Sequence, residues 1–283
     1  MSTRTPERSK TEGGVPDRLS DQEFATFQRL TLEATGIQIG ENKRSMIYSR
    51  FARRLRAKKM HSFTDYLELL ASPNSSEHGF FINTVTTNLT FFFREANHFD
   101  YLASTVLPAI AQEGRPGNKL KVWSSASSSG QEPYSLAMVL ADSPEIAGWT
   151  TRLLATDIDT DMVTRTREGI YAEPELRGLD DTRKRRWLEK KPDGRYQASS
   201  ALREMMICKQ LNLFHRWPIK PPVDIIFCRN VLIYFDRPDQ LKIVEGFHRI
   251  QRPGDYLFLG HSESSREITG LYKPVSNTVY RRI

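Results

Sequence analysis

The chain has 283 residues, 39% of them hydrophobic and 27% charged, and these proportions exclude a disordered or collagen-like chain. No apolar run approaches the roughly 18–20 residues that cross a bilayer, and the N-terminus has no apolar signal region, so we expect a cytoplasmic protein without membrane insertion. The formal net charge of +7 favours a partner with an acidic surface, which is compatible with nucleic acid, lipid or protein.

The two cysteines, Cys208 and Cys228, both lie in apolar, strand-like runs. This placement predicts buried free thiols in a reducing compartment. No cluster of cysteine and histidine has the spacing of metal ligands, so the sequence predicts no metal site.

The first hundred residues predict helices and no strand. A polar tail, residues 1–16, is expected to be disordered because it has no apolar periodicity. The run Leu19-Ser20-Asp21-Gln22-Glu23 is a capping box with an apolar residue ahead of the cap, and it begins the first helix. Further helices are predicted over Lys43–Lys59, after the cap Ser62 and over Glu77–Thr86.

Arg50, Arg53 and Arg56 repeat every three residues and therefore form one ridge of the second predicted helix. No carboxylate occurs between Glu41 and Asp65, so charges of one sign gather on this face. A solvated helix face explains such a stripe, and a docking surface for an anionic partner explains it equally well.

The segment Thr86–Glu95 connects the helical part to the rest of the chain. Asn88 and Thr90, which bond well to ligands or backbone, stand just before three consecutive phenylalanines and Arg94. Three phenylalanines are costly to expose together, so we expect the segment to lie in a groove between two units. A packed interdomain hinge and a ligand-binding connector both fit this pattern.

The stretch Leu120–Ala137 organises the remainder of the chain. Alternating apolar residues predict a strand, small residues with Gly130 predict a tight loop, and Pro133 takes a first-turn position in a helix. This layout holds nucleotide-like ligands in α/β sheets, because bare backbone and free helix N–H groups approach the ligand. The loop lacks G-x-G-x-x-G and a phosphate-binding lysine, and Glu132 suits hydroxyls or a cationic ligand, which favours a nucleoside with little phosphate. An ordinary strand-to-helix turn is the alternative.

Strands and helices alternate after Leu120, which predicts a parallel sheet with helices on both faces. The second strand ends at Asp157, where a Rossmann-type fold grips a ribose diol, while Asp159 is a candidate helix cap. A stretch rich in turn residues, 171–200, predicts an inserted lobe with a hairpin turn at Asp193-Gly194. The predicted strands are 119–124, 152–156, 205–211, 224–228, 256–259 and 278–281, and helices follow Pro133, Asp159, Asp181 and Arg237.

Polar residues follow two further strands, at the edge where carboxyl ends of parallel strands face a ligand crevice. Arg229-Asn230 follow the strand 224–228, with Tyr234 a few positions on, and these residues are candidates for substrate or cofactor contact. A Tyr234 packed with its hydroxyl on a backbone carbonyl is the alternative. His261 follows the strand 256–259 and is placed to carry a proton, but no acid–base partner is identified from the sequence.

Together these segments resemble the chemotaxis-receptor glutamate methyltransferases, the CheR family, over nearly all of residues 20–283. The resemblance depends on five motifs in the right order, each of them weak alone. The motifs are Thr87-Asn88-Leu89-Thr90-x-Phe92-Phe93-Arg94-Glu95, Val122-Trp123-Ser124 through Gly130-x-Glu132-Pro133-Tyr134-Ser135, Ala155-Thr156-Asp157-Ile158-Asp159, Phe227-Cys228-Arg229-Asn230-Val231-x-Ile233-Tyr234-Phe235 and Gly260-His261-Ser262-Glu263.

The resemblance implies the α/β fold class: a Rossmann-like S-adenosylmethionine-dependent methyltransferase domain with a small inserted β-subdomain, preceded by an all-helical N-terminal domain. The expected organisation is a tail at 1–16, a helical domain at 17–86, a linker at 87–100 that contributes to the cofactor site, and a methyltransferase domain at 101–283. The inserted subdomain is expected at about 171–204.

The resemblance also implies a protein-glutamate O-methyltransferase that modifies the cytoplasmic helical bundle of a chemoreceptor and leaves S-adenosyl-L-homocysteine. The basic ridge Arg50, Arg53 and Arg56 then becomes a substrate-docking surface. In some family members the inserted lobe tethers a C-terminal peptide of the receptor, and the sequence does not decide whether this chain does so. One departure is Gln131, where the family often has the first acid of Gly-Glu-Glu-Pro-Tyr-Ser. The implied reaction-centre residues are Arg94 and Tyr234, and the implied cofactor contacts are Asn88, Thr90, Arg94, Glu132, Asp157, Asn212, Leu213, Arg229 and Asn230.

Two other functions fit parts of the sequence. A methyltransferase acting on nucleic acid would explain the basic charge. However, the chain has no Asp/Asn-Pro-Pro-aromatic tetrad after the fourth strand, and no strand face that combines aromatic and basic residues for stacking bases. No nucleic acid partner is therefore expected. A non-catalytic adaptor would bind the cofactor and sense a partner, but Arg94 and Tyr234 argue against it.

Overall fold

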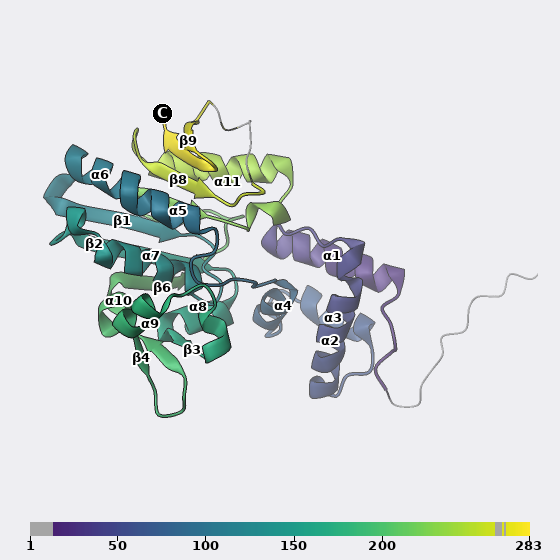
Figure 1. Ribbon diagram of the computed structural model, residues 1–283. Helices are drawn as coiled ribbons and strands as arrows, with labels where there is room; N and C mark the ends of the chain where they lie inside the picture. Colours follow the sequence, from purple (N-terminus) through teal and green to yellow (C-terminus); the bar gives the residue numbers. More distant parts are fainter. Residues whose placement is uncertain (1–13, 264–267, 269) are drawn as a thin grey trace, which may run out of the picture. The chain divides into compact units, whose positions relative to one another are not determined.

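The structure, a computed structural model, describes residues 14–263, 268 and 270–283, so most of the predicted tail lies outside the described residues. The chain divides into two compact units, Met1–Thr86 and Thr87–Ile283 (Figure 1). No helix in the described part of the chain is long and apolar enough to cross a membrane.

The first unit is helical, as predicted. Ser20 and Glu23 form the expected capping box, in which the Ser20 hydroxyl accepts the Glu23 N–H and the Glu23 carboxylate accepts the Ser20 N–H. Its core is aromatic: the rings of Phe27 and Phe51 lie 4.6 Å apart and both side chains are fully buried. The helices are α1 (Asp21–Thr35), α2 (Arg44–Lys58), α3 (Phe63–Ala71) and α4 (His78–Val85), with a 3₁₀ turn at Glu41–Lys43.

The second unit is built on a seven-stranded sheet of order β6-β2-β1-β7-β8-β10-β9 (Figure 1). The predicted parallel arrangement is confirmed for β6, β2, β1, β7 and β8. It is wrong for the last two strands, since β10 runs antiparallel to both β8 and β9. The strands are β1 (Lys119–Ser124), β2 (Thr150–Asp157), β6 (Met206–Gln210), β7 (Ile225–Cys228), β8 (Tyr256–Leu259), β9 (Tyr272–Ser276) and β10 (Val279–Arg282).

Helices cover both faces of this sheet, as predicted. On one face Phe99 packs against Phe227 with ring centroids 5.8 Å apart, and on the other Phe247 packs edge-on against Trp123 at 5.4 Å. The helices of the second unit are α5 (Ala96–Tyr101), α6 (Leu107–Glu113), α7 (Gln131–Asp142), α8 (Thr160–Glu168), α9 (Asp181–Trp187), α10 (Ser200–Met205) and α11 (Arg237–Ile250), with a π-helical stretch at Leu102–Val106 and 3₁₀ turns at Pro116–Asn118, Pro144–Ile146, Glu173–Leu176 and Leu232–Tyr234.

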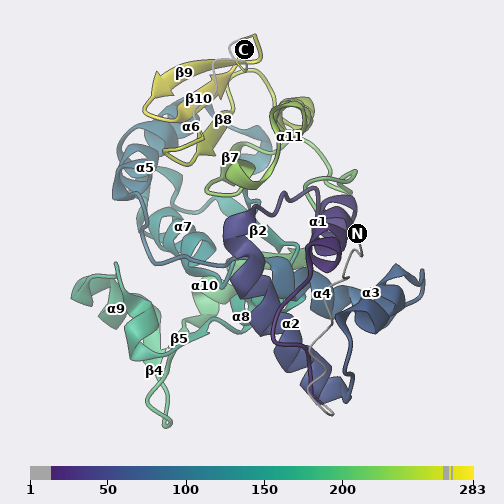
Figure 2. The same ribbon diagram turned by 90° about the vertical axis from the view of Figure 1, so that its right-hand side faces the viewer.

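The insertion forms a separate three-stranded sheet of order β3-β5-β4. Its strands are β3 (Ile170–Tyr171), β4 (Leu188–Lys190) and β5 (Tyr196–Ala198), and β4 pairs antiparallel with β5 around the predicted hairpin turn. The hairpin and α9 extend away from the main sheet (Figure 2). We call this part the inserted lobe.

Candidate active site

Arg229 follows β7 and ties three segments of the second unit together. Its Nη1 donates to Glu132 Oε2 at 3.0 Å, while its Nη2 lies 3.0 Å from Glu95 Oε2 and donates to the carbonyl oxygen of Arg94. The Arg229 side chain is only 1% exposed, so water screens these ion pairs weakly. Arg229 thereby joins the connector, the start of α7 and the loop after β7.

The two carboxylates beside Arg229 respond differently to their surroundings. Burial raises the pKa of Glu132, although the charge of Arg229 and a hydrogen bond of 2.8 Å from Ser124 Oγ oppose this. Burial also acts to raise the pKa of Glu95, but Arg229 and the side-chain amide of Asn230 outweigh it, so that pKa is lowered. Glu95 is therefore the more firmly ionised of the two.

Asn88 fastens the connector to the loop between β1 and α7. Its Nδ2 donates to Asp159 Oδ2 at 2.8 Å, and its carbonyl oxygen accepts from Ser128 Oγ at 3.1 Å. Asp157 accepts the backbone N–H groups of Ser128 at 2.7 Å and Asp159 at 3.0 Å, and burial raises its pKa to about 6. Each carboxylate oxygen has two lone pairs, so Asp157 still has capacity for ribose hydroxyls. Asp159 also caps α8, as expected.

Backbone strain gathers at these loops. Phe93, Glu95, Ser128 and Asn230 all have positive φ, between 48° and 59°, which non-glycine residues seldom adopt. Such conformations cost energy and persist where surrounding contacts fix them, commonly at ligand sites. The strain therefore marks the same edge of the sheet as the polar contacts.

Gln131 lies inside the loop that it helps to form. Its side chain is 3% exposed and its Oε1 accepts from Ser129 Oγ at 2.7 Å, while its carbonyl oxygen accepts from Ser135 Oγ. The amide is thus committed to the turn at the start of α7. Its place in the sequence, next to Glu132, gave no sign of this inward orientation.

Two of the three consecutive phenylalanines have partners in the second unit. Phe92 is fully buried against Tyr171 of the inserted lobe, and its N–H donates to the carbonyl oxygen of Arg177. Phe93 packs edge-on against Phe99 of α5 at 5.1 Å. These partners all belong to the second unit, so the run anchors the connector within that unit. The predicted groove between two units stays a prediction.

Glu263 organises the loop after β7, and nothing in the sequence indicated this. Its carboxylate accepts four backbone N–H groups at 2.7 Å, from Gly260, Asn230, Val231 and Leu232. A side chain at Gly260 would meet the Glu263 carboxylate at 2.6 Å, so glycine is needed for this approach. The contact fixes the backbone between Arg229 and Tyr234.

Replacing Glu263 with glutamine is expected to lower the free energy of unfolding by about 2–3 kcal/mol, because the amide offers one acceptor oxygen and leaves buried N–H groups unsatisfied. Urea unfolding of the full chain measures the change. The control is Glu189→Gln on an exposed position of β4, which should change stability by less than about 0.5 kcal/mol. Equal effects of the two substitutions would contradict the role given to Glu263.

Arg94 and Tyr234 have side chains with free hydrogen-bonding capacity. Arg94 Nη1 donates to the Leu89 carbonyl oxygen at 2.8 Å, which leaves other guanidinium N–H groups for a ligand. Tyr234 is half-buried in the turn Leu232–Tyr234, and its hydroxyl has no hydrogen-bond partner among residues 14–263, 268 and 270–283. The alternative of a Tyr234 hydroxyl bound to a backbone carbonyl is therefore not supported.

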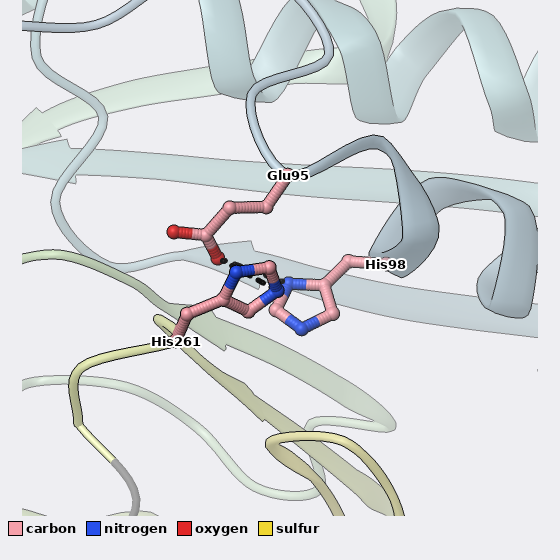
Figure 3. A group of neighbouring side chains, drawn as sticks. All are labelled: Glu95, His98 and His261. Carbon is pink, nitrogen blue, oxygen red and sulfur yellow. Dashed lines mark ion pairs between the residues drawn. The ribbon is translucent and has the colours of Figure 1, made fainter.

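His261 has partners that the sequence did not reveal. Its Nε2 lies 3.7 Å from Glu95 Oε2, and its ring centroid lies 5.1 Å from that of His98 (Figure 3). Glu95 and His98 sit at the start of α5, whereas His261 follows β8. Only the packing of α5 against the sheet brings these distant segments together, so spacing in the sequence gave no signal.

The basic ridge is only partly free. Arg50 is half-buried, and its Nη1 donates to the carbonyl oxygens of Thr84 at 2.5 Å and Thr86 at 2.8 Å. Arg53 and Arg56 are exposed, and neither forms an ion pair within the part of the chain that the structure describes. Arg50 therefore closes the end of α4, while the other two present their charge to solvent.

A buried carboxylate neutralises the side of α2 next to this ridge. Glu77, at the start of α4, pairs with Arg54 and Lys58 at 2.7 Å each, and its side chain is 1% exposed. Hydrogen bonds from Arg54 and Lys58 lower the pKa of Glu77 to about 2, against the opposing effect of burial. The absence of acids between Glu41 and Asp65 therefore overstated the excess charge on this helix.

The remaining candidate residues occupy the expected strand ends. Asn212 and Leu213 follow β6, the neighbour of β2; Asn212 Oδ1 accepts the Phe214 N–H at 2.9 Å and Leu213 is buried. Thr90 is half-buried in the connector. The structure joins Glu132, Asn230 and the backbone carbonyl of Arg94 in one group around Arg229 and Glu95, and Asn88 with Asp157 in a second group, whereas Arg50, Arg53 and Arg56 belong to the first unit.

Both cysteines are free thiols, as predicted. Cys228 in β7 is fully buried, but Cys208 is only half-buried because β6 is an edge strand of the sheet. Burial raises the pKa of both thiols, so neither suits a nucleophilic role.

Comparisons with known proteins cover both units. The family model "CheR methyltransferase, all-alpha domain" matches residues 22–86, and "CheR methyltransferase, SAM binding domain" matches residues 88–281. A probable chemotaxis protein methyltransferase of Rhizobium etli is 39% identical over 252 residues, covering 87% of this chain and 94% of its own length. Chemotaxis protein methyltransferases of Klebsiella aerogenes and Escherichia coli are 40% and 38% identical, each covering 93% of this chain and, respectively, 90% and 91% of their own lengths. The chain belongs to the CheR methyltransferase family.

Proposed function

We propose that this protein transfers the methyl group of S-adenosylmethionine to glutamate side chains on the cytoplasmic helical bundle of chemoreceptors, as a protein-glutamate O-methyltransferase acting in the cytoplasm. The products are a carboxyl methyl ester and S-adenosyl-L-homocysteine, and the reaction sets adaptation in chemotaxis-type signalling. The observation that supports this best is the position of Arg229, which links the backbone of Arg94 to the loop carrying Tyr234.

The chemistry of the site fits the cofactor. Asp157 at the end of β2 has lone pairs for ribose hydroxyls, and no lysine in the loop before α7 invites a phosphate. Glu132 and Glu95 place negative charge near Arg229, which suits a ligand with a cationic centre. When bound, S-adenosylmethionine supplies an electrophilic methyl group on a sulfonium.

The protein's own task is to position an acceptor that is already a nucleophile, since a glutamate carboxylate is ionised at neutral pH. The Arg94 guanidinium can hold one carboxylate oxygen by a charge-assisted hydrogen bond, and the Tyr234 hydroxyl can donate another. Too tight an ion pair would stabilise the ground state, so we assign these residues an orienting role in a water-poor site.

The direct test is base-labile incorporation of labelled methyl groups into purified chemoreceptor cytoplasmic domains, because alkali releases methanol from carboxyl esters but not from methylated nitrogen. Receptor methylation with complete alkaline release is the expected result. Labelled nucleic acid under the same conditions would indicate the nucleic-acid methyltransferase instead. Cofactor binding without transfer to any receptor domain would indicate the non-catalytic adaptor.

We further propose that the exposed ridge residues dock the receptor, whose methylation helices are rich in acidic residues. Arg53→Glu is expected to lower kcat/KM for receptor methylation by about 10-fold, with a larger effect at low salt, because it turns attraction into repulsion. Cofactor affinity should not change. The matched control, Arg18→Glu at an exposed position before α1, should leave kcat/KM unaltered. An Arg53→Glu variant with normal methylation at low salt would remove the docking role. Arg50 is unsuited to this test because it also supports α4.

Tethering of a receptor C-terminal peptide by the inserted lobe is a separate proposal. In the lobe β5 is paired on both sides, whereas β4 is an outer strand of the three-stranded sheet in the described part of the chain. An extended peptide can add to this edge as a further strand. A synthetic receptor C-terminal peptide should then bind the full chain with micromolar or better affinity in a fluorescence titration. Failure of the peptide to bind would refute the tethering proposal and would not bear on the proposed methyl transfer.

A further inference from the structure

Glu95, His98 and His261 form a compact group of potential metal ligands (Figure 3). Glu95 Oε2 lies 3.5 Å from His98 Nδ1 and 3.7 Å from His261 Nε2, and one ligand atom from each residue lies within 4.8 Å of the others. For zinc with ligand distances of roughly 2.0–2.1 Å, adjacent ligand atoms of a tetrahedron are about 3.3 Å apart. The two distances from Glu95 Oε2 are close to that value, and the third, between the two histidine nitrogens, is at most 4.8 Å.

The protonation of His98 leaves a lone pair directed at this group. Its Nε2 lies 2.9 Å from Thr278 Oγ1 and 3.3 Å from the carbonyl oxygen of Asn277. The carbonyl can only accept, so we assign the proton to Nε2, which leaves Nδ1 as an acceptor.

Two acceptors consequently face each other with nothing to bridge them. His98 Nδ1 and Glu95 Oε2 are both buried without a hydrogen-bond partner in the described structure. A lone pair opposite a carboxylate oxygen is unfavourable unless a cation lies between them. Two imidazole nitrogens and one carboxylate oxygen are a donor set that suits zinc and similar divalent transition metals.

We propose that Glu95, His98 and His261 bind a divalent transition metal of the zinc class. His261 is 43% exposed and provides access from solvent, while buried His98 is held in orientation by Thr278. The metal would have three protein ligands and one position open to water.

Arg229 is the one cation of the described structure that stands directly against this group, with Nη2 3.0 Å from Glu95 Oε2 but outside hydrogen-bond geometry. Its charge opposes a metal ion. Glu95 and Glu132 both pair with Arg229. The guanidinium is thus shared between two carboxylates and does not neutralise Glu95 alone.

The test is calorimetric titration of Zn²⁺ into the chelator-treated, untagged full chain. One Zn²⁺ per chain is expected, and His261→Gln should weaken its binding by at least about 100-fold, since it removes a ligand. The control is His215→Gln, an exposed histidine in the loop after β6, which should bind Zn²⁺ like the original chain. Thr278→Val should weaken binding by roughly 10-fold, because His98 Nε2 loses the hydroxyl that holds its ring in orientation.

Substitution with Co²⁺ distinguishes this site from the two thiols. Visible absorption of a four-coordinate nitrogen and oxygen site, without a thiolate charge-transfer band, is expected and should disappear in His261→Gln. A thiolate band would place the metal at Cys208 or Cys228 and overturn the proposal. Absence of stoichiometric Zn²⁺ binding, or binding unchanged in His261→Gln, would overturn it as well. These readouts do not depend on methyl transfer, so they stand or fall separately from the proposed function.

Discussion

Arg229→Met is expected to lower the free energy of unfolding by about 3–5 kcal/mol, because it leaves Glu132 and Glu95, whose side chains are 12% and 13% exposed, without their cation. The carbonyl oxygen of Arg94 also loses its donor. Urea unfolding of the full chain measures stability, and equilibrium binding measures affinity for S-adenosylmethionine, which should fall together with stability.

Two variants separate charge from geometry at this position. Arg229→Lys keeps the charge but cannot reach two carboxylates and a carbonyl at once, so its stability should fall between those of the original chain and Arg229→Met. Arg152→Met, on an exposed position of β2, is the matched control and should change stability by less than about 0.5 kcal/mol. If Arg229→Met were as stable as Arg152→Met, the three segments would not depend on the guanidinium.

Local signals in the sequence predicted most of the elements correctly. The capping box at Ser20, the cap Asp159 and the alternation in β1 each depend on residues a few positions apart, and the structure confirms all three. Strand β9 was missed because it contains Pro274, which argues against a strand interior. Its place at the edge of the sheet explains why proline is tolerated there.

Contacts between distant segments were the part that the sequence could not supply. The carboxylate of Glu263 reaches four backbone N–H groups, and backbone groups look the same in any sequence. Glu77 neutralises Arg54 and Lys58 from another helix, which a search along one helix cannot detect. The sequence therefore predicted which loops form the candidate site, while the groups that hold those loops are brought together only by the three-dimensional fold.

Tyr234→Phe is expected to reduce kcat for receptor methylation by roughly 10–150-fold, the equivalent of losing one hydrogen bond to a charged group, about 1.5–3 kcal/mol. The hydroxyl has no partner in the described structure, so stability should be unchanged and cofactor affinity nearly so. The matched control is Tyr101→Phe. The Tyr101 hydroxyl donates to the carbonyl oxygen of Val275 at 3.5 Å and not to a candidate site residue, so this variant should keep full activity.

The companion variant Arg94→Lys tests whether the two side chains orient the same carboxylate. Lysine keeps the charge but loses the planar fork, so we expect a fall in kcat of about 100-fold from misplacement of the acceptor. If both residues hold one glutamate, the double variant should lose less than the product of the single effects, with a coupling energy of about 0.5–3 kcal/mol. Strictly multiplicative effects would mean that Arg94 and Tyr234 act on different groups. Arg94 would then serve the cofactor alone, and the acceptor carboxylate would be oriented by Tyr234 without it.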